Sequence, residues 1–266
     1  MQRGRQLFLG LYCISQKLKA CTVMAKQSRS ETWAKILASM RHCNTCIGFS
    51  SSPFAVVRPP PKSFRPPNPK GRSFGGRIRV LFVSEAPPGG KHYGDFFWTD
   101  ERERDGLRSQ LLKACHAADL IAQETLKSFK SAGFYLLPTV PAATQRMGEY
   151  NENPSSGLLK HSATSHLARA MEYIKPERVF LLGESALDGA YHTLGSRSPE
   201  FKRDFESRRH PLRKILRENS PYSVTANLGA FGLYCSYWPR NGGNYRRTVE
   251  DLKRLRRDIA RGVAHR

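Results

Sequence analysis

Short apolar runs alternate along the chain with longer segments whose apolar residues recur at helical spacing. The run at 78–84 is continuous and rich in β-branched residues, which is typical of a strand buried on both faces. By the same criterion, further strands are expected at 134–140, 178–182, 223–226 and 233–237. Helices are expected at 31–40, 106–130, 162–174, 185–194, 203–218 and 248–260.

This alternation predicts the fold class. Strands that alternate with helices form a parallel sheet with helices on both faces. We therefore expect a three-layer α/β/α fold with a central, mainly parallel, four-stranded sheet. Ligands of such sheets bind at the carboxyl ends of the strands. The loops that follow Ser84, Leu137, Leu182 and Tyr237 are the places where a site is expected.

Composition divides the chain into four parts. Residues 1–30 form a basic leader, and Met24 offers a later start that would make 1–23 an over-long reading frame. Residues 31–76 hold a helix, Cys43 and Cys46, and a connector rich in Pro and Arg that favours an extended path. Residues 77–260 form the α/β domain, and 261–266 form a basic tail.

The charge points to a polyanionic partner. The 266 residues include 44 Lys and Arg against 22 Asp and Glu, a formal net charge of +22. Such an excess is typical of proteins that bind nucleic acid, so DNA, single- or double-stranded, is the expected partner. The alternative is a basic surface that binds nothing. The cations expected to form that surface are Arg203, Arg208, Arg209, Arg213, Lys214, Arg217, Arg246, Arg247, Lys253, Arg254, Arg256 and Arg257.

The setting is expected to be intracellular and reducing. Six unevenly spaced cysteines do not suggest a secreted disulfide scaffold. No run approaches the roughly 20 apolar residues of a membrane span, so no membrane association is expected. A monomer in a bacterial or archaeal cytoplasm, or associated with the nucleoid, fits best, although the basic leader leaves organellar targeting open.

The loop after the first expected strand is the main candidate for chemistry. Glu85 stands at the strand end, and the prolines and glycines of 87–90 allow a backbone to approach a ligand closely. A carboxylate there is a candidate general base or electrostatic stabiliser. The alternative is that Glu85 caps a turn or forms a surface ion pair. A phosphate loop is rejected, because Gly89-Gly90-Lys91 lacks the required first glycine and the following Ser or Thr.

Aromatic and basic residues supply candidates for nucleic-acid contact. Aromatic faces stack on bases, which suits Tyr93, Phe96 and Phe97, although these could equally belong to the core. Near the last expected strand, Arg, Asn and aromatic residues suit phosphate contact and base wedging. The candidates in that second region are Trp238, Arg240, Asn241, Arg246 and Arg247. The alternative there is a loose turn with Trp238 as a core plug.

Several motifs, taken in order, resemble one family. Val83-Ser-Glu-Ala-Pro-Pro-Gly89 is similar to the Gly-Glu-Ala-Pro-Gly motif of one branch of the uracil-DNA glycosylase superfamily. Cys43-x-x-Cys46 lies upstream, and Phe97 stands where that family stacks the base. Lys175–Gly183 resembles its third strand, and Trp238-Pro-Arg-Asn241 falls where its His-Pro-Ser-Pro motif stands. The resemblance covers about 32–258.

The resemblance implies a three-layer fold that flips a nucleotide out of DNA and cleaves its N-glycosidic bond. It would place Glu85 beside the sugar and the attacking water, and the 238–243 loop in the groove. The residues expected to form the base pocket are Ala86, Pro87, Tyr93, Phe96, Phe97 and Ser236.

The chain departs from the family at three places. Ser236 occupies the position of the motif's His, and the second strand lacks the Asn that reads uracil in relatives. The branch often holds a four-cysteine iron–sulfur cluster, but the third and fourth ligand positions fall near Thr139 and Ser165, which are not ligands. Cys115 and Cys235 are expected inside a helix and a strand. We therefore expect no cofactor and interpret Cys43 and Cys46 as a remnant.

Two functions follow. The first is a DNA glycosylase that excises uracil or another damaged or deaminated base in DNA repair, with Glu85 assisting water attack. The second is a nucleic-acid-binding protein that keeps the fold but has lost catalysis. Ser236 and the missing Asn favour the second function, whereas the intact Glu85 loop favours the first.

Overall fold

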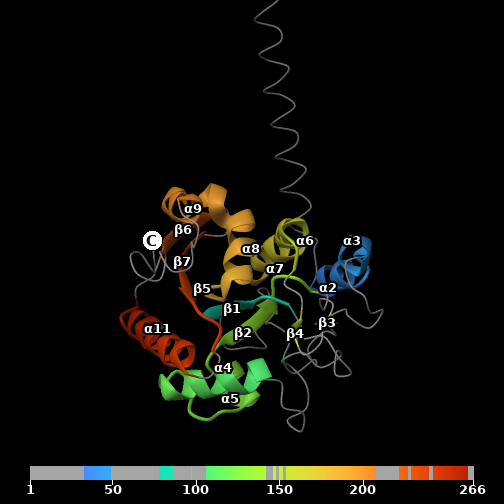
Figure 1. Cartoon of the computed structure of the whole chain (residues 1–266). Coiled ribbons are helices and arrows are strands. Elements are labelled where there is room, and N and C mark those ends of the chain that lie inside the picture. The colour runs from blue at the N-terminus through green and yellow to red at the C-terminus, as the bar shows by residue number, and fades with distance from the viewer. Residues whose placement is uncertain are drawn as a thin grey trace, which may run out of the picture.

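A mainly parallel sheet lies at the centre of the protein (Figure 1). The computed structural model describes residues 33–48, 78–86, 97, 106–141, 146–147, 150–151, 154–207, 222–226, 229–239 and 242–262. Within them, five strands are paired in the order β2-β1-β5-β7-β6. They are β1 (Val80–Ser84), β2 (Phe134–Pro138), β5 (Arg178–Leu182), β6 (Tyr222–Ala226) and β7 (Gly229–Ser236). The expected four parallel strands are confirmed, and β6 adds an antiparallel edge strand.

Helices cover both faces of the sheet (Figure 1). One layer contains α4 (Gly106–Ala117), α5 (Leu126–Ser131) and α11 (Gly243–Ala260). The other contains α2 (Trp33–Arg41), α6 (Ser156–Ser162), α7 (Ala168–Ile174) and α8 (Glu184–Leu194). The shorter elements are α3 (Asn44–Gly48), α9 (Pro199–Glu206), the π-helix η3 (Ala163–Leu167), the 3₁₀ turn η4 (Gly195–Arg197) and the two-stranded ribbon of β3 (Arg146–Met147) and β4 (Tyr150–Asn151). The three-layer prediction is thus confirmed. Among the described helices, none combines the length and apolarity needed to cross a bilayer.

A row of aromatic residues builds the core on the α5 and α11 side. Phe82, Phe180 and Tyr234 stand in register on β1, β5 and β7, with ring centroids 5.4 Å and 6.4 Å apart. Phe129 of α5 lies 5.4 Å from Phe82. All four are at most 1% exposed, and complete burial of such side chains stabilises a fold by roughly 1.5–3 kcal/mol each.

The N-terminal helix α2 packs on the opposite face of the sheet. The Trp33 ring meets Tyr135 of β2 edge-on at 6.1 Å and lies 5.6 Å from Tyr173 of α7. Ile36, Leu37 and Met40 are buried with it, as their helical spacing predicted. The helix and the α/β domain therefore share one hydrophobic core.

Several predicted boundaries are corrected. The segment 106–130 forms two helices, because Asp119 adopts a left-handed φ of 53° and Thr125 accepts a capping hydrogen bond from Ser128 N at 3.1 Å. Likewise, the helix expected at 162 begins at Ser156, where Ser155 caps it. The basic helix expected at 203–218 is described only to Glu206, and the rest of that span lies outside the described residues.

Candidate functional site

The carboxyl ends of β1 and β2 continue side by side beyond the sheet. Thr139 donates twice to the carbonyl oxygen of Ser84, from its N–H at 2.7 Å and from its hydroxyl at 2.8 Å. Val140 N–H then donates to the carbonyl oxygen of Glu85 at 2.9 Å. Thr139 is fully buried, so these bonds are shielded from water. The backbone at Glu85 is therefore held from the side by the neighbouring strand.

The Glu85 side chain forms a hydrogen bond with the start of α8. Ser185 Oγ donates to Glu85 Oε2 at 2.7 Å. Burial raises the pKa of Glu85, and the hydrogen bond from Ser185 partly opposes that rise. No ion pair joins Glu85 to a cation among the described residues, so the surface ion pair considered for it is absent there. A half-buried carboxylate of raised pKa at a strand end is suited to general-base chemistry.

Ser185 was missed by reasoning from the sequence. The strand β5 lies next to β1 and ends at the same edge, so the residues after Leu182 come close to those after Ser84. Gly183 makes the turn into α8 with φ 91°, a left-handed conformation that favours glycine, and its N–H donates to the carbonyl oxygen of Ser236 at 2.9 Å. The loop after β5 was a predicted site, but a single serine in it carried no signal of its own.

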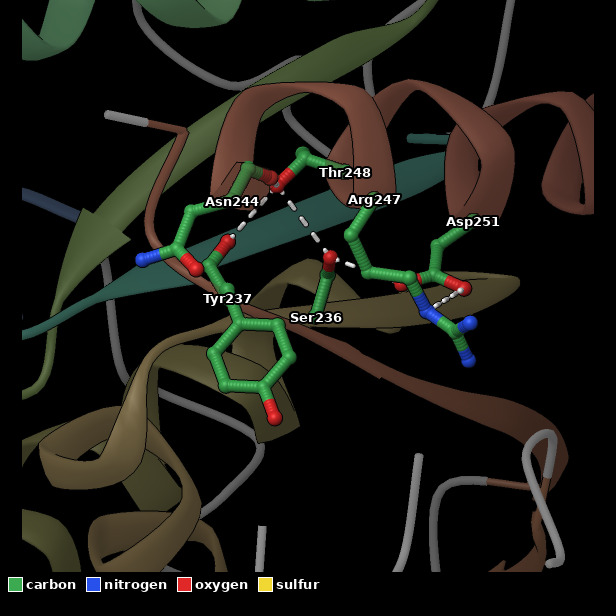
Figure 2. A network of polar contacts seen from close by, with 6 residues as sticks. All are labelled: Ser236, Tyr237, Asn244, Arg247, Thr248 and Asp251. Atoms are coloured by element: carbon green, nitrogen blue, oxygen red, sulfur yellow. Dashed lines mark hydrogen bonds and ion pairs between the residues drawn. The ribbon is translucent and has the colours of Figure 1, made fainter. Parts of the chain in front are cut away.

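A second hydroxyl–carboxylate pair lies at the end of β7 (Figure 2). Ser236 Oγ donates to Asp251 Oδ2 at 2.8 Å and lies 3.3 Å from Thr248 Oγ1. Arg247 Nε pairs with the Asp251 carboxylate at 3.6 Å. Burial raises the pKa of Asp251, and the bond from Ser236 and the cations Arg247 and Arg254 oppose the rise. Ser236 is 0% exposed, so its predicted place in a base pocket finds no support here, because its hydroxyl is turned to α11.

The cations expected to contact nucleic acid are divided between exposed and engaged side chains. Arg246 is exposed on the first turn of α11, and Arg247 is exposed but paired with Asp251. Trp238 is half-buried against the main core, which agrees with its alternative reading as a core plug. Arg240 and Asn241 lie outside the described residues.

Further along the basic surface, two cations are paired with acids. Lys253 pairs with Glu250 at 2.9 Å, and Arg256 with Asp119 at 3.0 Å. Both pairs are exposed, and such pairs stabilise a fold by only about 0–1 kcal/mol. They do not prevent α11 from facing a polyanion.

The predicted aromatic and apolar pocket residues are only partly described. Phe97 is fully buried and meets Phe129 edge-on at 5.3 Å, so it belongs to the core, as its alternative reading allowed. Its φ of 57° is left-handed, which is rare for a bulky residue. Ala86 is buried beside Val140 in a small apolar cluster. Pro87, Tyr93 and Phe96 lie outside the described residues.

The sequence offered no third or fourth metal ligand beside Cys43 and Cys46, but the structure places two histidines there. Cys43, Cys46, His161 and His166 place their ligand atoms within 4.8 Å of one another. Burial, helped by the nearby Cys43, raises the pKa of Cys46 to about 12, and burial beside His161 lowers the pKa of His166 to about 4. The predicted places of Cys115 and Cys235, inside a helix and a strand of the core, are confirmed.

The fold and these geometries define the class of protein. It is a three-layer α/β/α protein in which the Glu85 carboxylate accepts a hydrogen bond from Ser185 at the carboxyl edge of the sheet. A separate cluster of two cysteines and two histidines lies between the N-terminal helices and α6. Comparison with models of known protein families and with curated proteins gives no match for the chain.

Proposed function

We propose that the protein is a DNA glycosylase that flips a damaged or deaminated base, uracil or a related base, and hydrolyses its N-glycosidic bond. The observation that carries the proposal is the Glu85–Ser185 pair at the carboxyl edge of the parallel sheet. This edge is where α/β proteins bind ligands, and a flipped nucleotide can reach it although a stacked base cannot. The resemblance of the Glu85 loop to the glycosylase motif points to the same chemistry.

Glu85 is suited to act on the attacking water. In the proposed step, the water oxygen bonds to the sugar C1′ while the N-glycosidic bond breaks and its electron pair leaves with the base. The Glu85 carboxylate accepts the proton from the water. A negative charge beside the sugar also stabilises the positive charge that develops there. Partial burial strengthens Glu85 as a base because it raises the pKa.

Ser185 is proposed to orient that carboxylate. Its hydroxyl occupies one oxygen, Oε2, and Oε1, which accepts no hydrogen bond from the described residues, is left for the attacking water. The serine is half-buried in the first turn of α8, so the packing of that helix sets the direction of the bond. A carboxylate held in one rotamer loses less freedom when it engages a substrate.

DNA is the proposed partner because of charge. A net charge of +22 attracts a polyanion. The strand β7 ends at the same edge of the sheet as Glu85, and α11, which carries exposed cations, follows β7 along the chain. The loop 238–243 joins the two elements and is the proposed element for groove contact.

A second function is favoured by one observation. At the end of β7, where the resemblance calls for a group that stabilises charge on the leaving base, Ser236 is committed to Asp251 and fully buried. A protein that binds nucleic acid without excising a base would fit this arrangement. It would show salt-sensitive DNA binding and no base release.

Strand cleavage at abasic sites separates the two functions. Single strands and duplexes carrying uracil, hypoxanthine or xanthine are incubated with the wild-type protein and with Glu85→Ala, and abasic sites are then cleaved with alkali. Excision of at least one base, lost in Glu85→Ala, is expected. Excision that survives the substitution removes Glu85 from the mechanism. No excision, with DNA binding that weakens steeply as salt rises, establishes the binding function instead.

A further inference from the structure

Four metal-ligating side chains meet between the N-terminal helices and the α6–η3 segment. Cys43 lies between α2 and α3, Cys46 in α3, His161 in α6 and His166 in η3. The Cys43 sulfur is 3.2 Å from His161 Nε2, although 118 residues separate the two along the chain. All four ligand atoms lie within 4.8 Å of one another. Two distant segments thus contribute two ligands each.

A π-helical turn brings the two histidines together. Residues five apart on a regular α-helix point about 140° away from each other around the axis. Between His161 and His166 the helix widens to π geometry, with Ala168 N–H donating to the carbonyl oxygen of Ala163. The two imidazole centroids are 5.8 Å apart with the rings nearly perpendicular at 84°. Single π turns inside helices are frequent at functional sites.

His166 is an unpartnered polar side chain in a buried place. It is 5% exposed, and neither of its ring nitrogens has a hydrogen-bond partner. Burying a polar group without a partner is unfavourable, so such a group calls for an explanation, an ion included. Within the described part of the chain, the groups that act electrostatically on His166 are His161 and Arg169. The thiols of Cys43 and Cys46 supply the remaining face of the cluster.

We propose that Cys43, Cys46, His161 and His166 bind one Zn²⁺ ion in a tetrahedral, structural site. The spacings Cys-x₂-Cys and His-x₄-His are those of Cys₂His₂ zinc sites. With metal–sulfur bonds of about 2.3 Å and metal–nitrogen bonds of about 2.0–2.1 Å, a tetrahedron separates its donor atoms by roughly 3.3–3.8 Å. The ligand atoms reach that spacing with small side-chain rotations.

The donor set does not fit the four-cysteine iron–sulfur cluster that the family resemblance brought up. Two of the four ligands are imidazoles, whereas that cluster is held by four thiolates. Histidine-ligated two-iron clusters exist, but their cysteines and histidines bind different irons and stand further apart than one shared ion requires. A limit of 4.8 Å between all ligand atoms selects a single ion.

Surrounding contacts agree with a structural role. Cys46 N–H points to the Cys43 sulfur at 3.4 Å, a bond that stabilises a metal-bound thiolate. Four protein ligands leave no open coordination position, which is the mark of a structural rather than a catalytic zinc site. Cys46 also packs in one apolar cluster with Ala86, Val140, Leu158 and Leu159. The ion would therefore clamp the N-terminal helices to α6 and η3, beside Ala86.

Metal content and cobalt spectroscopy test the site on the full-length protein. Protein purified under reducing conditions is expected to hold about one Zn²⁺ per chain by elemental analysis. After zinc is removed, Co²⁺ is expected to give intense visible d–d bands of a tetrahedral site and a thiolate charge-transfer band in the near ultraviolet. Both signals are expected to disappear in Cys43→Ser and in His166→Ala. A colourless wild-type protein that binds neither ion overturns the proposal.

Two further variants make the result decisive. His42→Asn removes an exposed histidine beside Cys43 and should keep full metal content; an equal loss there would mean adventitious binding and overturn the site. His166→Cys should still bind Co²⁺, and its third thiolate should raise the charge-transfer absorption. Such a result would show that the loss of metal in His166→Ala comes from the missing ligand and not from misfolding. An unchanged cobalt spectrum in His166→Cys removes His166 from the site. Broad brown absorbance with bound iron and sulfide would replace zinc by a cluster and contradict the proposal.

Discussion

Two serine–carboxylate pairs stand at the same edge of the sheet and differ in what surrounds them. Ser185 donates to Glu85 at 2.7 Å, and Ser236 donates to Asp251 at 2.8 Å. In both pairs burial raises the pKa of the carboxylate and the serine hydroxyl partly opposes the rise. The bond chemistry is therefore the same in the two places.

The surroundings assign the pairs to different tasks. Ser236 is 0% and Asp251 7% exposed, and Arg247, Arg254 and Thr248 complete that network. Glu85 and Ser185 are both half-buried, and the described residues give Glu85 no cation. A satisfied, enclosed pair fastens α11 to β7. A half-open carboxylate with one partner is free to engage a ligand, which is the arrangement expected of a functional group.

The largest effect is expected on base excision. Glu85→Gln keeps the shape of the side chain but removes its basicity, so excision under single-turnover conditions should fall by about 10²-fold or more. Glu184→Gln is the matched control, because Glu184 is exposed at the start of α8, next to Ser185, and the substitution removes one charge from the same edge of the sheet. Equal losses in the two variants would show that only the net charge of the edge matters.

The buried pair should show its effect in stability. Ser236→Ala leaves the Asp251 carboxylate without its short donor in a closed environment, and loss of a bond to a charged group costs about 1.5–3 kcal/mol. The free energy of unfolding, measured in urea, should fall by that amount. Excision at equal folded fraction should stay near the wild-type rate. A loss of excision without a loss of stability would mean that Ser236 takes part in the reaction.

Ionisation of the Glu85 carboxyl group should lower the free energy of unfolding rather than raise it. Because burial raises the pKa of Glu85 in the folded state, the unfolded chain ionises first as the pH rises above about 4.3. Over that interval the folded state holds more protons, so wild-type stability falls with rising pH.

Glu85→Gln lacks this titration. It should match the stability of the wild type at low pH and exceed it near neutral pH, where the buried carboxylate of the wild type is ionised. Urea unfolding of both proteins across the pH range measures the difference. A variant that is less stable than the wild type at neutral pH would mean that Glu85 is held by contacts that favour its charge.

The smallest effect is expected from Ser185→Ala. Ser185→Ala removes one hydrogen bond between two half-buried side chains, so the free energy of unfolding should change by no more than about 0.5 kcal/mol. Removal of the donor raises the pKa of Glu85 further, so the acidic limb of the excision pH profile should move to higher pH. If the acidic limb does not move, Ser185 does not influence the pKa of Glu85.

The sequence predicted the layers well because burial leaves a periodic pattern. The continuous apolar run of β1 and the helical spacing of Trp33, Ile36, Leu37 and Met40 could be read directly. The break between α4 and α5 could not, because no glycine or proline marks it and Asp119 takes the left-handed turn. The antiparallel placement of β6 also depends on tertiary pairing and leaves no local trace.

The site was predictable only where one residue carries its own signal. Glu85 stands out at a strand end, whereas Ser185 matters through its distance from Glu85, which the sequence does not contain. The histidine pair was missed because residues five apart share a face only where a helix widens to π geometry. His-x₄-His read together with Cys-x₂-Cys was the available signal.

The pKa of Glu85 itself tests the central claim most directly, since it requires no substrate. Carbon-13 labelling of glutamate side chains gives the titration curve by NMR, and Glu85→Gln identifies the resonance. We expect an apparent pKa above the ordinary glutamate value of about 4.3, raised further by Ser185→Ala and unmoved by Ser236→Ala. A pKa at or below the ordinary value would show a fully solvated or charge-paired carboxylate and contradict the account.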